Sequence, residues 1–337
     1  MEILVTGGAG YIGSHTIVSL IENGFDTVVI DDLYSGHKEA VSEIKTQNFT
    51  GRQVRFYRGD FSDIALLDKI IKQHDIKGVI HFAAYSLVGE SVTDPVKYYF
   101  NNIAKTVIFL NFLKNHGIGN FVFSSSAAVY GIPESVPIKE TAPLNPINPY
   151  GATKLSVEKL LEYMKGAYKF NYISLRYFNA AGAHPTGIIG EDHNPETHLI
   201  PSVLRSLANG EGKATVFGND YPTIDGTPIR DYIHVMDLSE AHVMTMKFLL
   251  ESGETRSGVY NLGDGTGFSV MEIIKKIIEI TGKEIKTEIT DRRMGDPPVL
   301  VASYEKIKNE LGFQLKYSID DIISSAWKWH SSHPKGF

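Results

Sequence analysis

The stretch Val5-Thr6-Gly7-Gly8-Ala9-Gly10-Tyr11-Ile12-Gly13-Ser14 decides the fold of this chain of 337 residues. It follows an apolar run that begins at Ile3 and precedes an amphipathic run. A strand, a glycine-rich turn and a helix in this order bring backbone N–H groups and a helix N-terminus to a pyrophosphate. Glycine is needed where a side chain would block the phosphate or keep the helix from packing on the strand. The stretch therefore predicts a dinucleotide-binding turn, with a tight turn that binds nothing as the alternative.

Two acidic residues indicate which dinucleotide is bound. Asp31 and Asp32 end the second apolar run, about as far beyond the glycines as the acid that contacts an adenosine ribose. A carboxylate there would repel a 2′-phosphate, so the predicted cofactor is NAD rather than NADP.

Short apolar runs and helical patterns alternate through the first half of the chain. The runs typical of strands cover residues 3–6, 27–31, 54–57, 78–82, 121–125 and 172–177. The helical patterns cover residues 12–23, 64–74, 95–116 and 150–168. This alternation predicts an α/β fold with a Rossmann-like, doubly wound parallel sheet.

The pattern becomes irregular after residue 178. We predict an NAD-binding Rossmann domain over residues 1–178 and a smaller irregular α/β lobe for the substrate over residues 179–337. Helical periodicity returns at 236–250 and 270–280, and a short strand is expected at 259–262. Segments near 234–262 are expected to return to the first domain.

Composition excludes several classes of protein. The net charge of -6 and the lack of any stretch dense in Lys and Arg argue against a nucleic-acid partner. The absence of cysteine excludes disulfides, thiolate metal sites and a cysteine nucleophile. No room for a signal peptide precedes Ile3 and no run approaches a membrane span, so we expect a cytoplasmic protein with no membrane partner.

Small and polar residues follow three of the predicted strands. Asp60 follows the third strand, where it could take an adenine amine, and Ala83 and Ala84 follow the fourth, where they let a cofactor lie close to the backbone. Ser126 follows the fifth, where the nicotinamide end is expected. Ligands of open α/β sheets lie across these strand ends, although helix caps and tight turns use the same residues.

Tyr150 and Lys154 share a helix face, because residues four apart are neighbours on a helix. A fixed positive charge beside a phenol favours the phenolate and lowers its pKa from about 10. The pair could therefore take a proton from an alcohol, and Ser126 could bond the same hydroxyl. The spacing alone is common in ordinary amphipathic helices. The catalytic role of the pair is therefore inferred mainly from the glycine turn and Ser126, which accompany it.

The motifs resemble the extended short-chain dehydrogenase/reductase family and, within it, the 4-epimerases of UDP-hexoses. The resemblance covers nearly the whole chain, through the successive segments VTGGAGYIGSH, HFAA with VGES, FSSSAAVYG, NPYGATK, LRYFNAAGAH, VFGNDYPTIDGTPIRDYIHVMDL and RRMGDPP. It implies reversible C4 epimerisation of UDP-glucose and UDP-galactose through a 4-keto sugar, with NAD bound. It gives Tyr150 the role of base, Lys154 that of holding the nicotinamide ribose and lowering the tyrosine pKa, and Ser126 that of helping to move the proton.

The resemblance also implies the binding residues. The cofactor positions are Gly7, Gly10, Tyr11, Ile12, Gly13, Asp31, Asp32, Leu33, Tyr34, Ser35, Gly36, Asp60, Phe61, Phe82, Ala83, Ala84, Ser86, Asn101, Ser124, Tyr150, Lys154 and Phe178. The UDP-hexose positions are Ser126, Tyr150, Asn179, His198, Leu199, Thr215, Phe217, Arg230, Arg293, Asp296 and Leu300. A homodimer is also implied, with the predicted helices over 95–116 and 150–168 available as its interface.

Two positions depart from the family pattern. Ser86 stands where well-known members carry a lysine, which puts one cofactor contact in doubt and could weaken NAD retention. Leu300 stands where some members place a tyrosine beside the sugar. Because leucine is smaller, we hypothesise activity on UDP-N-acetylglucosamine and UDP-N-acetylgalactosamine as well.

Three other functions would use a similar fold and cofactor. A nucleotide-sugar 4,6-dehydratase would carry Asp-Glu after the catalytic Ser or Thr, whereas Ala127 and Ala128 follow Ser126 here. A net dehydrogenase would accumulate NADH, and a non-catalytic NAD-sensing protein need not keep Ser126, Tyr150 and Lys154 together.

One cluster of metal-ligand residue types also occurs in the chain. Glu191, Asp192, His193, Glu196 and His198 sit in a loop without recognised ligand spacing, so no metal is expected.

Overall fold

The computed structural model describes residues 1–47, 50–251, 255–293 and 296–337. Residues 294 and 295 of the motif RRMGDPP lie outside the described residues. Among those described, no helix combines the length and the apolar character that crossing a membrane requires.

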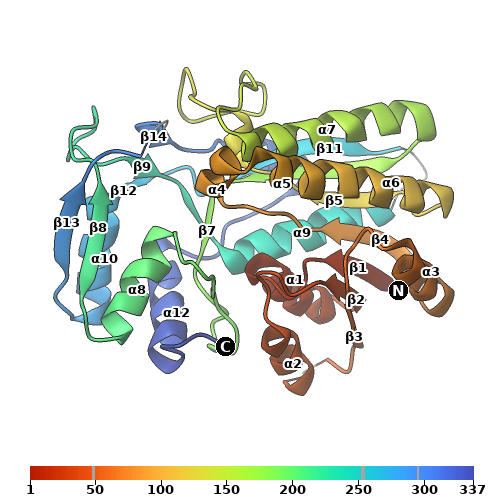
Figure 1. The fold of residues 1–337 in the computed structure, drawn as a ribbon, viewed down its shortest axis with the longest axis horizontal. Coiled ribbons are helices and arrows are strands. Elements are labelled where there is room, and N and C mark those ends of the chain that lie inside the picture. Colours follow the sequence, from red (N-terminus) through yellow and green to blue (C-terminus); the bar gives the residue numbers. More distant parts are fainter. Residues whose placement is uncertain (48–49, 252–254, 294–295) are drawn as a thin grey trace.

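A seven-stranded parallel sheet forms the larger part of the molecule (Figure 1). Its strands are β1 (Glu2–Thr6), β2 (Asp26–Asp31), β3 (Val54–Arg58), β4 (Ile76–His81), β5 (Asn120–Ser124), β6 (Asn171–Tyr177) and β11 (Ser257–Leu262). They lie in the order β11-β6-β5-β4-β1-β2-β3. The predicted doubly wound sheet is confirmed, and β11 pairs with β6 along six residue pairs, so the strand expected near 259–262 does rejoin it.

Alternating side chains of β1 face two separate apolar cores. Ile3 and Val5 pack in one cluster with side chains of α1 (Tyr11–Glu22), α2 (Lys38–Thr46) and α9 (Val235–Leu250). Leu4 packs in the other, with side chains of α3 (Ile64–Gln73), α6 (Lys105–Asn115) and α7 (Pro149–Tyr168). Successive residues of a strand point to opposite faces, so a continuous apolar run is buried on both.

The prediction of one continuous helix over residues 95–116 is wrong. After α4 (Val88–Thr93), the chain forms α5 (Pro95–Tyr99), a π-helical turn over Phe100–Ala104, and then α6. The amide of Asn102, in that turn, accepts from Tyr85 N at 2.9 Å and donates to Tyr85 O at 3.0 Å. The wider turn therefore ties this helix to the segment after β4, as π-turns near functional sites often do.

The smaller lobe is built from the second half of the chain and lies to the left in Figure 1. Its helices are α8 (Leu199–Ala208), α10 (Val270–Thr281) and α12 (Ile319–Ser332), which share an apolar core that includes Leu204, Ile277 and Ile323. Its short strands are β8 (Lys213–Phe217), β9 (Ile229–Arg230), β12 (Phe268–Ser269), β13 (Lys286–Thr290) and β14 (Val299–Leu300).

Two further strands and a helix complete the connections. β7 (Asn179–Ala181) pairs in parallel with β10 (Tyr232–His234), and α11 (Glu305–Leu311) precedes α12. Sequence periodicity did not predict α2, α4, α8, α11 or α12. The division of the chain at residues 178 and 179 stays a prediction.

Candidate active site

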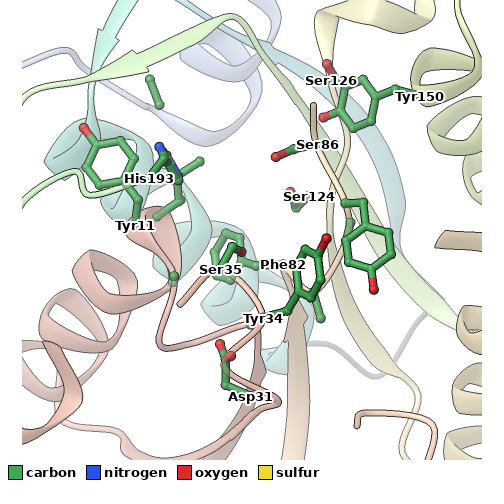
Figure 2. Close-up of a pocket in the computed structure, with 18 of the residues that line it drawn as sticks. Tyr11, Asp31, Tyr34, Ser35, Phe82, Ser86, Ser124, Ser126, Tyr150 and His193 are labelled. Carbon is green, nitrogen blue, oxygen red and sulfur yellow. The ribbon is translucent and has the colours of Figure 1, made fainter. Parts of the chain in front are cut away.

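The first cavity lies at the carboxyl ends of the sheet strands, where the chain order reverses. From β1 the chain runs outward to β3, and it then returns to β4 on the other side of β1. Ligands of doubly wound sheets bind at this reversal. Figure 2 shows the cavity with Asp31 at one end, Tyr150 and Ser126 at the other, and Ser86 and Ser124 between them.

The glycine turn has the shape that a bound pyrophosphate requires. Gly7 has a φ of +71°, and a Cβ there would lie 2.6 Å from the backbone N of Ala83. A Cβ at Gly13 would lie 2.2 Å from the carbonyl O of Gly7, so glycine lets α1 pack this closely. At Gly10 the only neighbour would be 3.4 Å away, and no side chain caps the start of α1. Space and unused N–H groups at this helix N-terminus suit a diphosphate.

Asp31 has a structural task at the end of β2 besides its predicted contact with the ribose. It is 7% exposed, and its carboxylate accepts from Ala9 N at 2.9 Å and from Leu33 N at 2.8 Å. These bonds hold the glycine turn against the bend at Leu33, where φ is +64°. Burial raises the pKa of Asp31, and the two backbone hydrogen bonds oppose that rise.

The cavity collects most of the predicted cofactor positions. Those that line it are Gly7, Gly10, Tyr11, Ile12, Gly13, Asp31, Asp32, Tyr34, Ser35, Phe61, Phe82, Ala83, Ala84, Ser86, Asn101, Ser124, Tyr150, Lys154 and Phe178. Leu33, Gly36 and Asp60 are not among the lining residues. Asp60 instead pairs with Lys105 at 2.5 Å and accepts from Ser62, and Gly36 packs on Ala9.

Tyr150, Lys154 and Ser126 meet at the inner end of the cavity. Tyr150 is 8% exposed, and it lies beside Ser126 in Figure 2. Lys154 is 4% exposed and donates to Ser124 O at 2.7 Å, with its Nζ 5.8 Å from the centre of the Tyr150 ring. The spacing of four residues therefore does place the ammonium beside the phenol.

The predicted lowering of the Tyr150 pKa is wrong for the protein without its cofactor. Burial raises the pKa of Tyr150, and the neighbouring Ser126 hydroxyl lowers it only in part. Burial also lowers the pKa of Lys154 to about 7, against the opposing charge of Glu158. The expectation overlooked the desolvation of both groups, which disfavours each charged form. A positive charge brought into this cavity would favour the phenolate, and the oxidised nicotinamide ring carries one.

Tyr177 is a lining residue that the motifs did not single out. Its hydroxyl hydrogen-bonds with the Ser124 hydroxyl, and removal of this group from water raises its pKa. Its place as the last residue of β6 was the available signal, since strand ends build this site. Tyr85, Glu191 and His193 also line the cavity without having been assigned to the cofactor.

A second cavity adjoins the first and lies in the smaller lobe. It is lined by eight predicted UDP-hexose positions: Asn179, His198, Leu199, Thr215, Phe217, Arg230, Arg293 and Asp296. Asn179 and His198 line both cavities, so the two meet at these residues.

The two arginines of the second cavity are held by different contacts. Arg230 pairs with Asp296 at 2.5 Å, and the Arg293 guanidinium stacks on the Phe217 ring at 4.1 Å. Guanidinium groups arranged in this way suit a diphosphate.

Leu300 lies outside the residues that line either cavity. It pairs with Arg230 across β9 and β14, and it packs against the apolar cluster of Tyr130, Ile138 and Ala302. Its expected place beside the sugar therefore remains a hypothesis.

The fold and the two cavities define an NAD-binding class of protein, and comparison with known families gives the same class. A profile of the NAD dependent epimerase/dehydratase family matches residues 3–263, and the chain belongs to that family. The cofactor of the family is NAD, which the lining of the first cavity fits.

Individual relatives are similar over the full length. The UDP-glucose 4-epimerase of Halalkalibacterium halodurans is 50% identical and covers 100% of this chain and 98% of that protein. The crystal structure of UDP-glucose 4-epimerase from Bifidobacterium longum in complex with NAD+ and UDP has a TM-score of 0.94 at 39% identity, covering 100% of both chains. The structure of the UDP-Glc/GlcNAc 4-epimerase from Campylobacter jejuni has a TM-score of 0.83 at 39% identity, covering 98% of this chain and 99% of that one.

Proposed function

We propose that this protein is a UDP-glucose 4-epimerase, which interconverts UDP-glucose and UDP-galactose by inversion at C4 with NAD bound. One observation carries the proposal: the cavity that holds Tyr150 and Ser126 shares Asn179 and His198 with the cavity that holds the two arginines. A sugar attached to a diphosphate in the second cavity would present its ring to these hydroxyls.

The side chains have separate tasks in the proposed reaction. Tyr150 takes the proton of the C4 hydroxyl and later returns it, and the neighbouring Ser126 hydroxyl relays that proton. Lys154, fixed by Ser124 O, holds the nicotinamide ribose. Bound NAD supplies a hydride acceptor that returns the hydride to C4 in the same cycle.

Inversion requires the 4-keto sugar to turn between the two hydride transfers. The charged groups of the second cavity, Arg230 and Arg293, would hold the diphosphate firmly, and both are fixed by their neighbours Asp296 and Phe217. The reacting end offers single hydroxyl groups, which bond a sugar without gripping it in one orientation. This division between a fixed nucleotide and a loosely held ring supports epimerisation over a one-way oxidation.

The dehydratase alternative has less support. Ala127 and Ala128 form a short 3-10 turn with Val129 directly after Ser126. A methyl group at each position cannot remove the C5 proton or protonate a leaving hydroxyl, which elimination of water requires.

The substrate range and the assembly belong to the same proposal. We infer that the acetylated UDP-hexoses are also substrates, because Leu300 is smaller than the tyrosine that some family members carry at this position. We further infer a cytoplasmic homodimer formed through α5, α6 and α7 and the turn between α5 and α6, where Val96, Phe100, Val107 and Tyr163 are exposed. α5, α6 and α7 lie next to one another in Figure 1.

The test is turnover of UDP-galactose by purified protein without added NAD, with the products separated by chromatography. We expect UDP-glucose to form with no net NADH. Tyr150→Phe should lower kcat by about 10²- to 10⁴-fold, because it removes the proton acceptor and keeps the ring. Unimpaired turnover by the variant would remove Tyr150 from its role.

A further inference from the structure

A cluster of two glutamates and two histidines lies between β7 and α8, outside the proposed proton transfer. Glu191 Oε1 lies 3.3 Å from His193 Nδ1 and 3.0 Å from His198 Nδ1. Glu196 places Oε1 3.0 Å from His198 Nδ1 and Oε2 3.6 Å from His193 Nδ1. One atom from each residue can be chosen so that all four lie within 4.8 Å of one another.

These separations are short enough for the four residues to share one ion. Nitrogen and oxygen ligands lie about 2.0 to 2.2 Å from zinc, so ligands of one tetrahedral site lie about 3.3 to 3.5 Å from one another. The four separations, from 3.0 to 3.6 Å, span this value, with His198 close to one oxygen of Glu196 and His193 close to the other. Both imidazoles turn the same nitrogen, Nδ1, towards the carboxylates.

Hydrogen bonds alone do not satisfy the cluster. His193 Nδ1 and Glu196 Oε2 are shielded from solvent and have no hydrogen-bond partner. The Glu196 side chain is only 7% exposed, and this oxygen still lies 3.6 Å from the imidazole. This separation is too long for a hydrogen bond and short enough for two ligands of one cation. Buried polar atoms rarely stay unpaired, because each costs about 1 to 3 kcal/mol.

The charge of the cluster also calls for a cation. The Glu191 and Glu196 side chains are 4% and 7% exposed, so two carboxylates are desolvated side by side. A divalent cation would balance these two buried negative charges, since buried charges are paired or coordinate metals.

We propose that Glu191, His193, Glu196 and His198 bind one divalent transition-metal ion of the zinc type. Two imidazoles favour zinc over magnesium or calcium, which prefer oxygen ligands. Four protein ligands make a closed site with a structural task. The inference does not depend on the proposed epimerase activity.

The ion would join the substrate lobe to the glycine turn. The His193 ring meets the Tyr11 ring edge-on at 6.1 Å, and Figure 2 shows the two residues together at the far side of the cavity from Tyr150. His198 precedes α8 and lines both cavities, while the opposite edge of its half-exposed ring stays open to them. Metal binding would therefore order the loop where cofactor and substrate cavities meet.

Asp192 provides a matched control within the same loop. Its carboxylate lies 3.6 Å from Arg205 and accepts from Phe337 N at 3.0 Å, so it turns away from the cluster. Asp192→Asn keeps an acceptor for that N–H group and leaves the four ligands in place.

The experiment uses the full-length protein, stripped with a chelator and titrated with zinc chloride in a calorimeter. We expect one zinc per chain, confirmed by elemental analysis, and no displacement by magnesium. Glu196→Gln and His193→Gln should each weaken zinc binding by at least about tenfold, as losses at metal sites do. Asp192→Asn should bind zinc like the parent.

Cobalt gives a readout that does not require the variants to fold. In the parent protein, Co²⁺ should give the intense visible bands of tetrahedral coordination. Absence of stoichiometric zinc binding, or weak octahedral cobalt bands, would overturn the proposal. Equal affinity in the parent and in folded Glu196→Gln and His193→Gln would show an adventitious ion only.

Discussion

At the residue scale, the reacting pair shows how burial competes with charge. Tyr150 and Lys154 lie on one face of α7, but their shared cavity removes water from both. Desolvation therefore raises the tyrosine pKa and lowers the lysine pKa in the protein alone. The phenolate needed for catalysis depends on the charge that the cofactor brings, which links proton transfer to cofactor occupancy.

We expect Lys97 to help retain NAD, because Ser86 stands where well-known family members carry a lysine. Its Nζ donates to the Tyr34 hydroxyl at 2.8 Å and lies 4.8 Å from the Tyr85 ring centre, and both tyrosines line the cofactor cavity. Lys97→Met should release these rings and increase the rate of NAD loss about two- to tenfold, the range expected from a lost cation–π contact. The NAD content of dialysed protein measures this.

Lys114 is the matched control, because it lies 5.0 Å from the Tyr168 ring centre, away from the cavity. Lys114→Met should keep the NAD content of the parent. Equal NAD loss from parent and Lys97→Met would mean that the tyrosines hold their place without the ammonium.

Leu300 is expected to set the substrate range. Leu300→Tyr adds a ring to β14 beside Arg230, so it should reduce kcat/KM for UDP-N-acetylglucosamine more than for UDP-glucose. An estimate of about 10- to 200-fold follows from the usual limit of steric discrimination. Measurement of all four UDP-sugars tests it, and no turnover of the acetylated pair by the parent would contradict the hypothesis.

At the element scale, the π-helical turn shows where periodicity failed. Residues 95–116 read as one helix because their apolar residues keep a helical spacing, and both flanking segments are indeed helical. Asn102 instead bonds both backbone polar groups of Tyr85 and donates to Thr153 at 3.2 Å. These partners come from other elements, so the local sequence could not indicate them.

The exposed face of the same helices is expected to hold two subunits together. Phe100 is 61% exposed and Val96 is 76% exposed, one turn apart. Phe100→Asp should shift the protein from dimer to monomer in light scattering, because a charge in an apolar interface stays unpaired.

Ile289→Asp provides the comparison, since Ile289 is 56% exposed on β13 in the other lobe. It should leave the mass unchanged. A monomeric parent protein would contradict the proposed assembly.

At the scale of the whole molecule, buried histidines should make the fold sensitive to acid. Burial lowers the pKa values of His15, His81, His234, His242 and His330 to about 3 or 4. Between those values and about 6.5 the unfolded chain binds more protons, so stability falls as pH falls. Four carboxyl groups act in the opposite sense because burial raises their pKa values, but they are fewer: Glu22, Asp31, Asp231 and Asp237.

Urea unfolding between pH 7.5 and 4.5 tests this, with an expected loss of several kcal/mol. His242→Leu removes one such histidine, whose Nε2 has no hydrogen-bond partner. Its stability should fall less steeply with acidification than that of the parent. Stability that rises towards pH 5 would contradict the prediction.

Short stretches of the sequence were enough to predict the sheet, the glycine turn and the reacting pair. Each is a local pattern: an apolar run makes a strand, glycines make room for a phosphate, and a gap of four residues places Tyr150 beside Lys154. Contacts along a few residues suffice for such features, and their order along the chain sets the topology.

Features that depend on burial and on residues far apart in the chain emerge only when the chain folds. Folding pairs Asp60 with Lys105 and places Leu300 outside the residues that line either cavity. It also buries Tyr150 and Lys154, which raises the pKa of the tyrosine and lowers that of the lysine. It also brought the Nδ1 atoms of two histidines against two buried glutamates in a loop whose spacing predicted no metal. The physical reason is the same throughout: desolvation and side-chain direction follow from how distant elements pack, and no local spacing encodes them.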